Sequence, residues 1–149
     1  LPGALASGVD VSEAALRVAQ RNAERLGLSG RIDLRRSRWF DAIGPTEAFD
    51  AIVSNPPYVA RADEPSLAPE VREHEPALAL FAEPDDELSS YRAIIGGLDG
   101  HLRSSGLLAF EVGAGQADRV ASLMTGAGFH SMEILNDLGS IPRVVLGRR

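Results

Sequence analysis

The chain alternates between strand-like and helix-like segments, and this alternation restricts its fold class more than any other feature. Four short apolar runs predict strands: 5–11, 32–36, 49–54 and 106–112. Three stretches with apolar residues three or four positions apart predict helices: 12–26, 88–102 and 116–127. Runs at 131–136 and 143–146 predict a closing antiparallel pair. Because strands that alternate with helices form sheets covered by helices, the sequence predicts an α/β fold with a mainly parallel sheet.

The segment 59–86 interrupts this alternation. It contains four prolines and many acidic residues, which predicts a long ordered loop with at most short helical turns. At its end, Asp85, Asp86 and Glu87 are interpreted as a solvated stretch leading into the next helix. Loops this long in compact domains often carry function.

The composition excludes several kinds of chemistry. The 149 residues include no cysteine, and all 15 basic residues are arginine, which excludes thiolate nucleophiles and lysine Schiff bases. Three scattered histidines predict no metal site, and the net charge of −6 argues against direct nucleic-acid binding. No apolar run approaches the length of about 18 residues needed to cross a membrane, and no export signal is visible. We therefore expect a cytoplasmic protein without a membrane partner.

The most informative motif is Asn55-Pro56-Pro57-Tyr58, directly after the apolar run 49–54. Two prolines fix φ and remove two backbone donors, so the turn is stiff. It presents the Asn55 carboxamide, free carbonyl groups and one aromatic ring. An amide oxygen and a carbonyl oxygen together accept both hydrogens of a planar –NH2 group, and Tyr58 is placed to stack on it. We therefore predict a substrate site at residues 55–58.

Asp10 and Trp39 are candidate cofactor residues. Asp10 ends the first predicted strand, where a carboxylate suits ribose hydroxyls. It could instead cap the following helix, although the adjacent Ser12 can take that role and leave Asp10 free. Trp39, the sole tryptophan, follows the second predicted strand and could flank an adenine ring, with packing in the core as the alternative.

Together these features resemble the S-adenosyl-L-methionine-dependent methyltransferases of class I, which have a Rossmann-like fold. More narrowly, the chain resembles the glutamine N5-methyltransferases of peptide chain release factors. The matching stretches are GVDVSEAAL, RRSRWF, IVSNPPYV, VREHEPALALF, YRAII, LLAFEVGAGQ and RVVLG. The Asn-Pro-Pro-Tyr motif is shared with adenine and other amino methyltransferases, whereas VREHEPALAL with LLAFEVGAGQ points to the release factor family.

The resemblance implies a cofactor, a partner and site roles. Asp10 would bind the ribose of S-adenosyl-L-methionine, and Trp39 would lie by the adenine. Residues 55–58 would hold the glutamine of the Gly-Gly-Gln motif of a release factor beside the methyl group, without a metal ion. Arg38 departs from the family pattern, because relatives usually carry an acidic residue before the aromatic one.

A second departure concerns the extent of the match. Residues 1–149 correspond to part of one methyltransferase catalytic domain, truncated at its N-terminus. The first strand, its glycine-rich loop and the family's N-terminal helical domain have no counterpart in these residues. The absent strand lies in mid-sheet in the family, so two strands, near residues 5 and 49, are expected to keep unpaired edges. We therefore expect this chain alone to bind the cofactor weakly.

Two other functions remain compatible with the motif. One is an amino methyltransferase acting on adenine in DNA or RNA, which would need base flipping and a positive groove. The acidic stretch 63–87 argues against it. The other is an inactive fragment that serves as a binding module, for which the missing glycine-rich loop is the main support.

Overall fold

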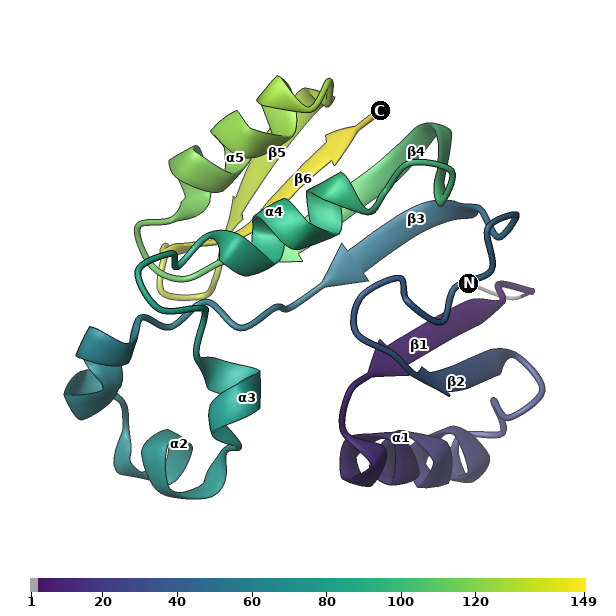
Figure 1. Cartoon of the computed structure of the whole chain (residues 1–149), viewed down its shortest axis with the longest axis horizontal. Helices are drawn as coiled ribbons and strands as arrows, with labels where there is room; N and C mark the ends of the chain where they lie inside the picture. Colours follow the sequence, from purple (N-terminus) through teal and green to yellow (C-terminus); the bar gives the residue numbers. More distant parts are fainter. Residues whose placement is uncertain (1–2) are drawn as a thin grey trace. The chain divides into compact units, whose positions relative to one another are not determined.

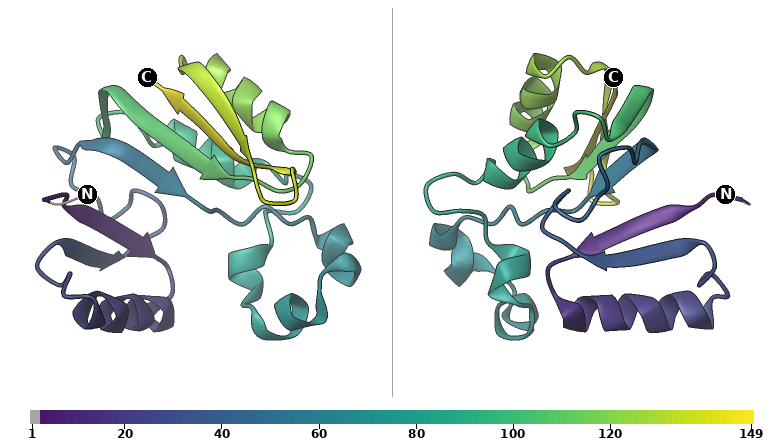
Figure 2. Two further views of the ribbon diagram at one scale, coloured as in Figure 1. Left: turned by 180° about the vertical axis from the view of Figure 1, so that it is seen from behind. Right: turned by 45° about the vertical axis from the view of Figure 1, so that its right-hand side comes forward.

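A computed structural model describes residues 3–149, which form two compact units, residues 3–45 and 46–149 (Figure 1). The first unit contains strand β1 (Ala6–Asp10), helix α1 (Glu13–Arg25) and strand β2 (Ile32–Arg36). The two strands are parallel, with Asp10 opposite Arg36. Helix α1 covers one face of this pair (Figure 2). All three elements match the sequence prediction.

Local chemistry explains why α1 begins and ends where it does. The Ser12 hydroxyl accepts a hydrogen bond from the Ala15 N–H at 3.3 Å, which caps the first turn. Gly27 follows the helix with a φ of +68°, a conformation that glycine adopts without a steric penalty. The predicted cap at Ser12 is therefore confirmed.

The second unit is built on a four-stranded sheet in the order β3-β4-β6-β5. Its strands are β3 (Phe49–Ser54), β4 (Leu102–Glu111), β5 (His130–Asn136) and β6 (Pro142–Arg148). Strands β3 and β4 are parallel, whereas β6 pairs antiparallel with both β4 and β5. Helices α4 (Ser89–Gly96) and α5 (Ala117–Gly126) lie on the same face of this sheet (Figures 1 and 2). The predicted closing antiparallel pair is thus confirmed.

The core of this unit lies between the two helices and the sheet. The rings of Tyr91 on α4 and Phe110 on β4 meet edge to face, with centroids 5.2 Å apart. Leu108 on β4, Val120 on α5 and Val145 on β6 are all 0 % exposed. Apolar residues from these strands and both helices therefore share one interior.

A matched pair of leucines tests this assignment of the core. Leu108→Ala should lower the free energy of unfolding by about 2–5 kcal/mol, because it leaves a cavity in packed surroundings. Leu138, fully exposed in the β5–β6 turn, should tolerate the same change within about 0.5 kcal/mol. Urea unfolding of both variants measures the two losses, and equal losses would contradict this core.

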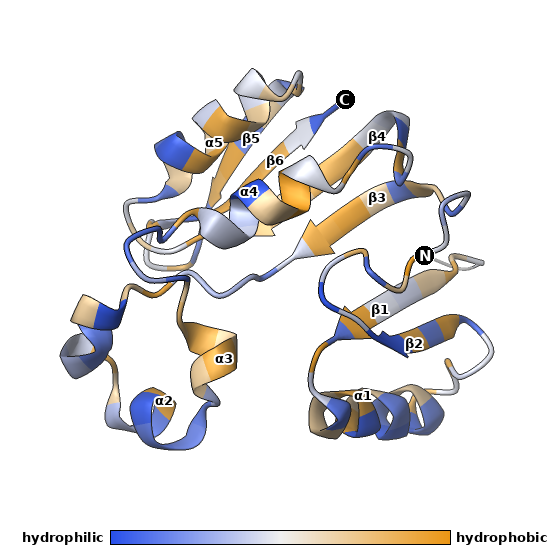
Figure 3. Ribbon diagram, viewed as in Figure 1, coloured by the Kyte–Doolittle hydropathy of each residue, from blue (hydrophilic) through white to orange (hydrophobic). Residues whose placement is uncertain are grey.

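Strand β3 is more exposed than its composition predicts. The run 49–54 is predicted as a buried strand, and Figure 3 shows most of β3 as hydrophobic. Nevertheless, Val53 is 75 % exposed and Ala51 is exposed. Within the described residues 46–149, β3 pairs with β4 along one edge and has no strand on its other edge. The prediction of a buried strand is therefore wrong for the face of β3 that carries Ala51 and Val53, because successive side chains of a strand point to opposite faces and only the other face is packed.

Helix α4 is shorter than predicted. Apolar spacing predicts a helix over 88–102, but α4 ends at Gly96 and Leu102 begins strand β4. Consecutive glycines at 96 and 97 cost helix stability and allow the chain to turn there. The apolar residues beyond the glycines fit the helical period but pack as a turn and a strand.

Segment 59–86 forms the predicted ordered loop with short helical turns. It contains a 3-10 helix η1 (Arg61–Ser66) and the short helices α2 (Pro69–His74) and α3 (Ala77–Leu80). The loop is closed by two backbone hydrogen bonds, from the Val59 N–H to the Leu80 carbonyl at 2.9 Å and from the Ala82 N–H to the Val59 carbonyl at 3.0 Å. Across residues 3–149, no helix has the length and apolar character to cross a membrane.

Candidate active site

Residues 55–58 lie at the carboxyl end of the parallel strands β3 and β4. Ser54, the last residue of β3, pairs with Phe110 one residue before the end of β4. Open α/β sheets bind ligands at such ends. We call residues 55–58 the corner. Within it, Pro56 is fully buried, whereas Asn55 is exposed. The Asn55 carboxamide makes no hydrogen bond with any residue of the described chain, so its donors and acceptor are free for a ligand.

A small hollow adjoins this corner. It has a volume of about 80 Å³ and is lined by residues from the corner and from the loop 59–86: Asn55, Pro56, Tyr58, Val59, Glu75, Ala79 and Leu80. The backbone bonds between Val59 and residues 80–82 bring α3 against the corner. Further along the loop, the Arg61 guanidinium lies over the Phe81 ring, 3.9 Å from its centroid. The loop thus supplies one wall of the hollow.

Tyr58 completes the corner as a half-buried ring. Its hydroxyl donates to a Glu111 carboxylate oxygen at 3.4 Å, a long bond. Burial raises the pKa of Tyr58 above its usual value, and the negative charge of Glu111 raises it further. The hydroxyl therefore keeps its proton at neutral pH and remains a donor.

Behind the corner lies a buried polar cluster that sequence reasoning missed. Gln116, at the start of α5, is 5 % exposed and contacts the Tyr58 carbonyl, the Tyr91 hydroxyl and the Glu87 carboxylate. Burial is the main cause that raises the pKa of Tyr91. Gln116 follows Gly113 and Gly115 in the turn between β4 and α5. No signal in the turn itself shows that Gln116 reaches residue 58.

Glu87 corrects the interpretation of residues 85–87 as a solvated stretch. Asp86 does lead into helix α4, because its side chain accepts from the Leu88 N–H at 3.1 Å. Glu87, however, pairs with Arg119 and accepts from the Gln116 side chain at 3.0 Å. Its partners come from α5, which is distant in sequence, so local composition could not reveal the contact. The hydrogen bond from Arg119 is the main cause that lowers the pKa of Glu87, followed by the bond from Gln116.

This lowered pKa predicts a dependence of stability on pH. The ionised Glu87 stabilises the fold fully above its unfolded pKa of about 4.3, and this contribution is lost as pH falls through the lower folded pKa. Glu87→Gln should therefore make the loss of stability below about pH 5 less steep than in the unmodified protein. Urea unfolding across this range measures the slope. Arg119→Met should flatten it similarly, and an unchanged slope in both variants would contradict the pairing.

Asp10 and Trp39 lie together at the carboxyl edge of the β1–β2 pair. The Ser37 N–H donates to the Asp10 carbonyl at 3.0 Å, which continues the pairing past β2. The Ser37 hydroxyl, in turn, donates to the Trp39 carbonyl at 3.2 Å. Trp39 is half-buried, with a φ of +48°, a strained value for a bulky residue. The turn 37–39 therefore holds Trp39 at the same edge as Asp10.

Asp10 is exposed, but only part of its carboxylate is free, whereas the sequence predicts a wholly free side chain. Its Oδ1 accepts from the Ser12 N–H at 2.7 Å, although the Ser12 hydroxyl caps the helix. Oδ2 of Asp10 accepts no hydrogen bond from residues 3–149. One carboxylate oxygen thus fixes the side chain, and the other can accept from a ribose hydroxyl, so the residue fits the predicted role.

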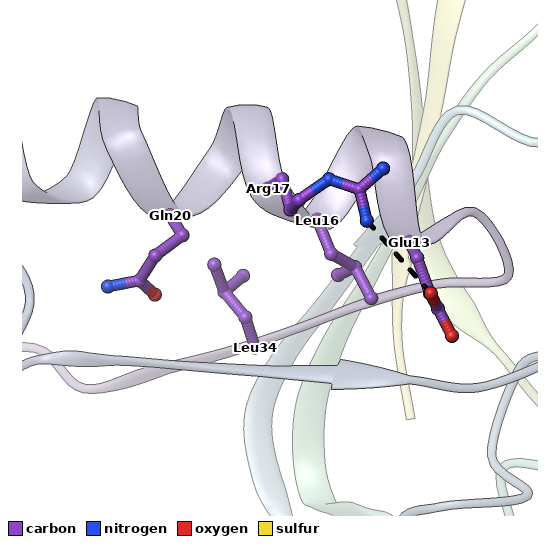
Figure 4. A pocket seen from close by; sticks show the side chains of 5 residues that line it. All are labelled: Glu13, Leu16, Arg17, Gln20 and Leu34. Atoms are coloured by element: carbon purple, nitrogen blue, oxygen red, sulfur yellow. Dashed lines mark ion pairs between the residues drawn. The ribbon is translucent and has the colours of Figure 1, made fainter.

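A larger hollow of about 310 Å³ lies between α1 and β2 (Figure 4). Its lining residues are Glu13, Leu16, Arg17, Gln20 and Leu34, and Glu13 pairs with Arg17 across 4.0 Å. None of the predicted site residues lines it. In residues 3–149, no group of three or more metal-ligating side chains comes together.

Comparison with known proteins supports a methyltransferase. The model of the RMKL-like methyltransferase domain family (UPF0020) matches residues 3–70. Among solved structures, a methyltransferase from Pyrococcus furiosus aligns with a TM-score of 0.66 and 16% identity, over 95% of this chain and 61% of that one. The N-terminal domain of human METTL16, solved in complex with SAH, aligns with a TM-score of 0.64 and 15% identity, over 99% of this chain and 53% of that one. These likenesses show the Rossmann-like fold of class I methyltransferases.

Curated relatives match at much higher identity. The release factor glutamine methyltransferase of Cereibacter sphaeroides is 46% identical over 99% of this chain and 52% of its own length. The protein of the same name in Gloeobacter violaceus is 45% identical over 98% of this chain and 51% of its own length. The chain thus spans about half the length of these relatives. Identity of this extent shows that the chain is homologous to one half of each of these release factor glutamine methyltransferases.

Proposed function

We propose that this chain carries the catalytic residues of an enzyme that methylates a peptide chain release factor. The methyl group would pass from the sulfur of S-adenosyl-L-methionine to the side-chain nitrogen (N5) of the glutamine in the Gly-Gly-Gln motif. The carbon–sulfur bond would break to leave the neutral thioether S-adenosylhomocysteine, and the nitrogen would release one proton to water. The observation that supports this most directly is the exposed, unpaired carboxamide of Asn55 in a hollow at the end of β3. The names of the curated relatives support the same substrate.

The corner 55–58 suits a primary amide. The Asn55 oxygen and the Pro56 carbonyl are acceptors on a stiff turn, and together they can bind both N–H groups of the glutamine side chain. An amide nitrogen is a poor nucleophile because its lone pair is delocalised. Two acceptors orient this nitrogen and enrich it electronically. Holding the reacting atoms in line supplies most of the rate gain in such a transfer.

The cofactor residues act by binding alone. S-adenosyl-L-methionine, when bound, supplies a methyl group on a positively charged sulfur. Asp10 would hold the ribose through Oδ2, while Oδ1 stays on the Ser12 N–H. Trp39 would pack its half-buried ring against the adenine. Tyr58 would close over the substrate amide with its hydroxyl still protonated.

Side-by-side methylation distinguishes this proposal from methylation of adenine. The complete gene product, with methyl-labelled cofactor, is offered a release factor, a duplex DNA and a structured RNA. Label in the release factor supports the proposal. Label in either nucleic acid, with none in the release factor, would indicate that the corner binds adenine as its substrate.

A further inference from the structure

The side chain of Gln116 is almost entirely buried, and its carboxamide makes four hydrogen bonds. Its Oε1 accepts from the Gly113 N–H at 3.1 Å and from the Tyr91 hydroxyl at 3.2 Å. Its Nε2 donates to the Tyr58 carbonyl at 3.1 Å and to a Glu87 carboxylate oxygen at 3.0 Å. A buried carboxamide with four partners holds one fixed position.

The chemistry of the partners determines which way this amide faces. The backbone N–H of Gly113 can only donate, so it must meet the oxygen of Gln116. The Tyr58 carbonyl and the ionised Glu87 carboxylate can only accept, so they must meet the nitrogen. If the amide were flipped, its nitrogen would face the Gly113 N–H, and its oxygen would face the Tyr58 carbonyl and the Glu87 carboxylate. Donor would then meet donor, or acceptor would meet acceptor, at three contacts. The direction of the bond from Gln116 to Tyr58 is therefore set by its surroundings.

This bond holds the candidate substrate corner from behind. Pro56 and Pro57 have no N–H, so neither of these two residues can anchor the corner as a backbone donor. Because both prolines fix φ, fixing the Tyr58 carbonyl also restricts where Asn55 lies. Gly113 permits the close approach, since a Cβ there would lie 3.0 Å from both the Tyr58 ring and the Gln116 carboxamide.

We propose that Gln116 is a positioning residue for methyl transfer, which acts through the Tyr58 carbonyl to hold Asn55 at the reacting amide. The inference rests on the proposed function, because it assigns Gln116 to the same substrate corner. Glu87, held by Arg119, orients the Gln116 nitrogen but does not touch the corner.

The test compares variants of the complete gene product in methyl transfer to a release factor. Gln116→Met keeps the volume but removes the donor, and kcat should fall by about 10- to 100-fold, because a shift of about 1 Å in a positioned group costs that much. KM for the release factor should stay within about threefold, since this buried side chain does not face the substrate. Val120→Ala, one turn along α5, is the matched control. It should lower the melting temperature while leaving kcat within about twofold.

A charge exchange separates the contact with Tyr58 from the contact with Glu87. Gln116→Glu should lower kcat as Gln116→Met does, because a carboxylate cannot donate to the Tyr58 carbonyl. Glu87→Gln should leave kcat within about twofold, since the oxygen of the introduced amide still accepts from Gln116. In the double variant E87Q/Q116E, the amide introduced at position 87 can donate to the carboxylate introduced at position 116, so the melting temperature should recover while kcat stays low. Recovery of kcat in the double variant would overturn the proposal.

Crystal structures test this inference independently of the proposed function. In Gln116→Met, the backbone of residues 55–58 should move by more than about 0.5 Å from its place in the unmodified protein. A corner that stays in place would overturn the inference, whatever the activity. An unmodified protein that transfers no methyl group to release factors would refute the proposed function, while this comparison would still decide whether Gln116 holds the corner.

Discussion

Replacing Asn55 with alanine should lower kcat/KM for methyl transfer to a release factor by about 100- to 1000-fold. The estimate follows from losing one hydrogen-bonding group that orients and polarises the reacting amide. The fold should be unaffected, because the Asn55 side chain is exposed and makes no hydrogen bond within residues 3–149. Steady-state transfer of labelled methyl to a purified release factor measures the change, together with the melting temperature.

Asn22→Ala provides the matched control for Asn55→Ala. Asn22 is also exposed, on helix α1, and its carboxamide makes one long bond of 3.4 Å with Arg25. Its loss should leave methyl transfer within about twofold, as for surface positions away from a site. If Asn55→Ala retains activity within a few-fold of the unmodified protein, Asn55 does not bind the substrate amide.

Replacing Asp10 with asparagine should weaken binding of S-adenosyl-L-methionine to the complete gene product by about 10- to 100-fold. Asparagine keeps an oxygen for the Ser12 N–H, so the local turn is preserved. It loses the charged acceptor at Oδ2, and hydrogen bonds to charged groups contribute about 1.5–3 kcal/mol. Calorimetric titration with the cofactor gives the two dissociation constants.

Asp33→Asn is the matched control for the cofactor residue. Asp33 is an exposed carboxylate in strand β2. In the register of the strands it lies opposite Ser7, near their amino-terminal ends and away from the edge that holds Asp10. Its replacement should leave the dissociation constant within about twofold. Equal affinities of Asp10→Asn and the unmodified protein would show that Asp10 does not bind the ribose.

Local patterns were sufficient to predict most elements of the fold. Serine before an amphipathic stretch and glycine after it predicted α1 to within two residues. The end of α4 was missed because apolar spacing continues through Gly96 and Gly97 to Leu102. The prediction followed this spacing and gave too little weight to two glycines that weaken a helix. The exposure of Val53 was missed because composition reports which residues can be buried but not which neighbours are present.

In the candidate site, too, residues with a local signal could be predicted, whereas residues held by distant partners could not. Asn55, Tyr58 and Asp10 could be chosen as candidates because a polar residue at the end of an apolar run is a local signal. Gln116 and Glu87 were missed because their partners lie 58 and 32 residues away in the chain. A buried network formed by tertiary contacts has no pattern in any one segment, and coordinates are needed to reveal it.

Mass spectrometry of a modified release factor shows whether the enzyme methylates the glutamine of the Gly-Gly-Gln motif. The complete gene product is incubated with S-adenosyl-L-methionine and a release factor purified without this modification, and the peptide that contains Gly-Gly-Gln is fragmented. We expect one added methyl group, on the side-chain nitrogen of that glutamine, and none when Asn55→Ala replaces the unmodified enzyme. A methyl group on another residue of the release factor, or an unmodified glutamine beside methylated adenine in added nucleic acid, would contradict this expectation.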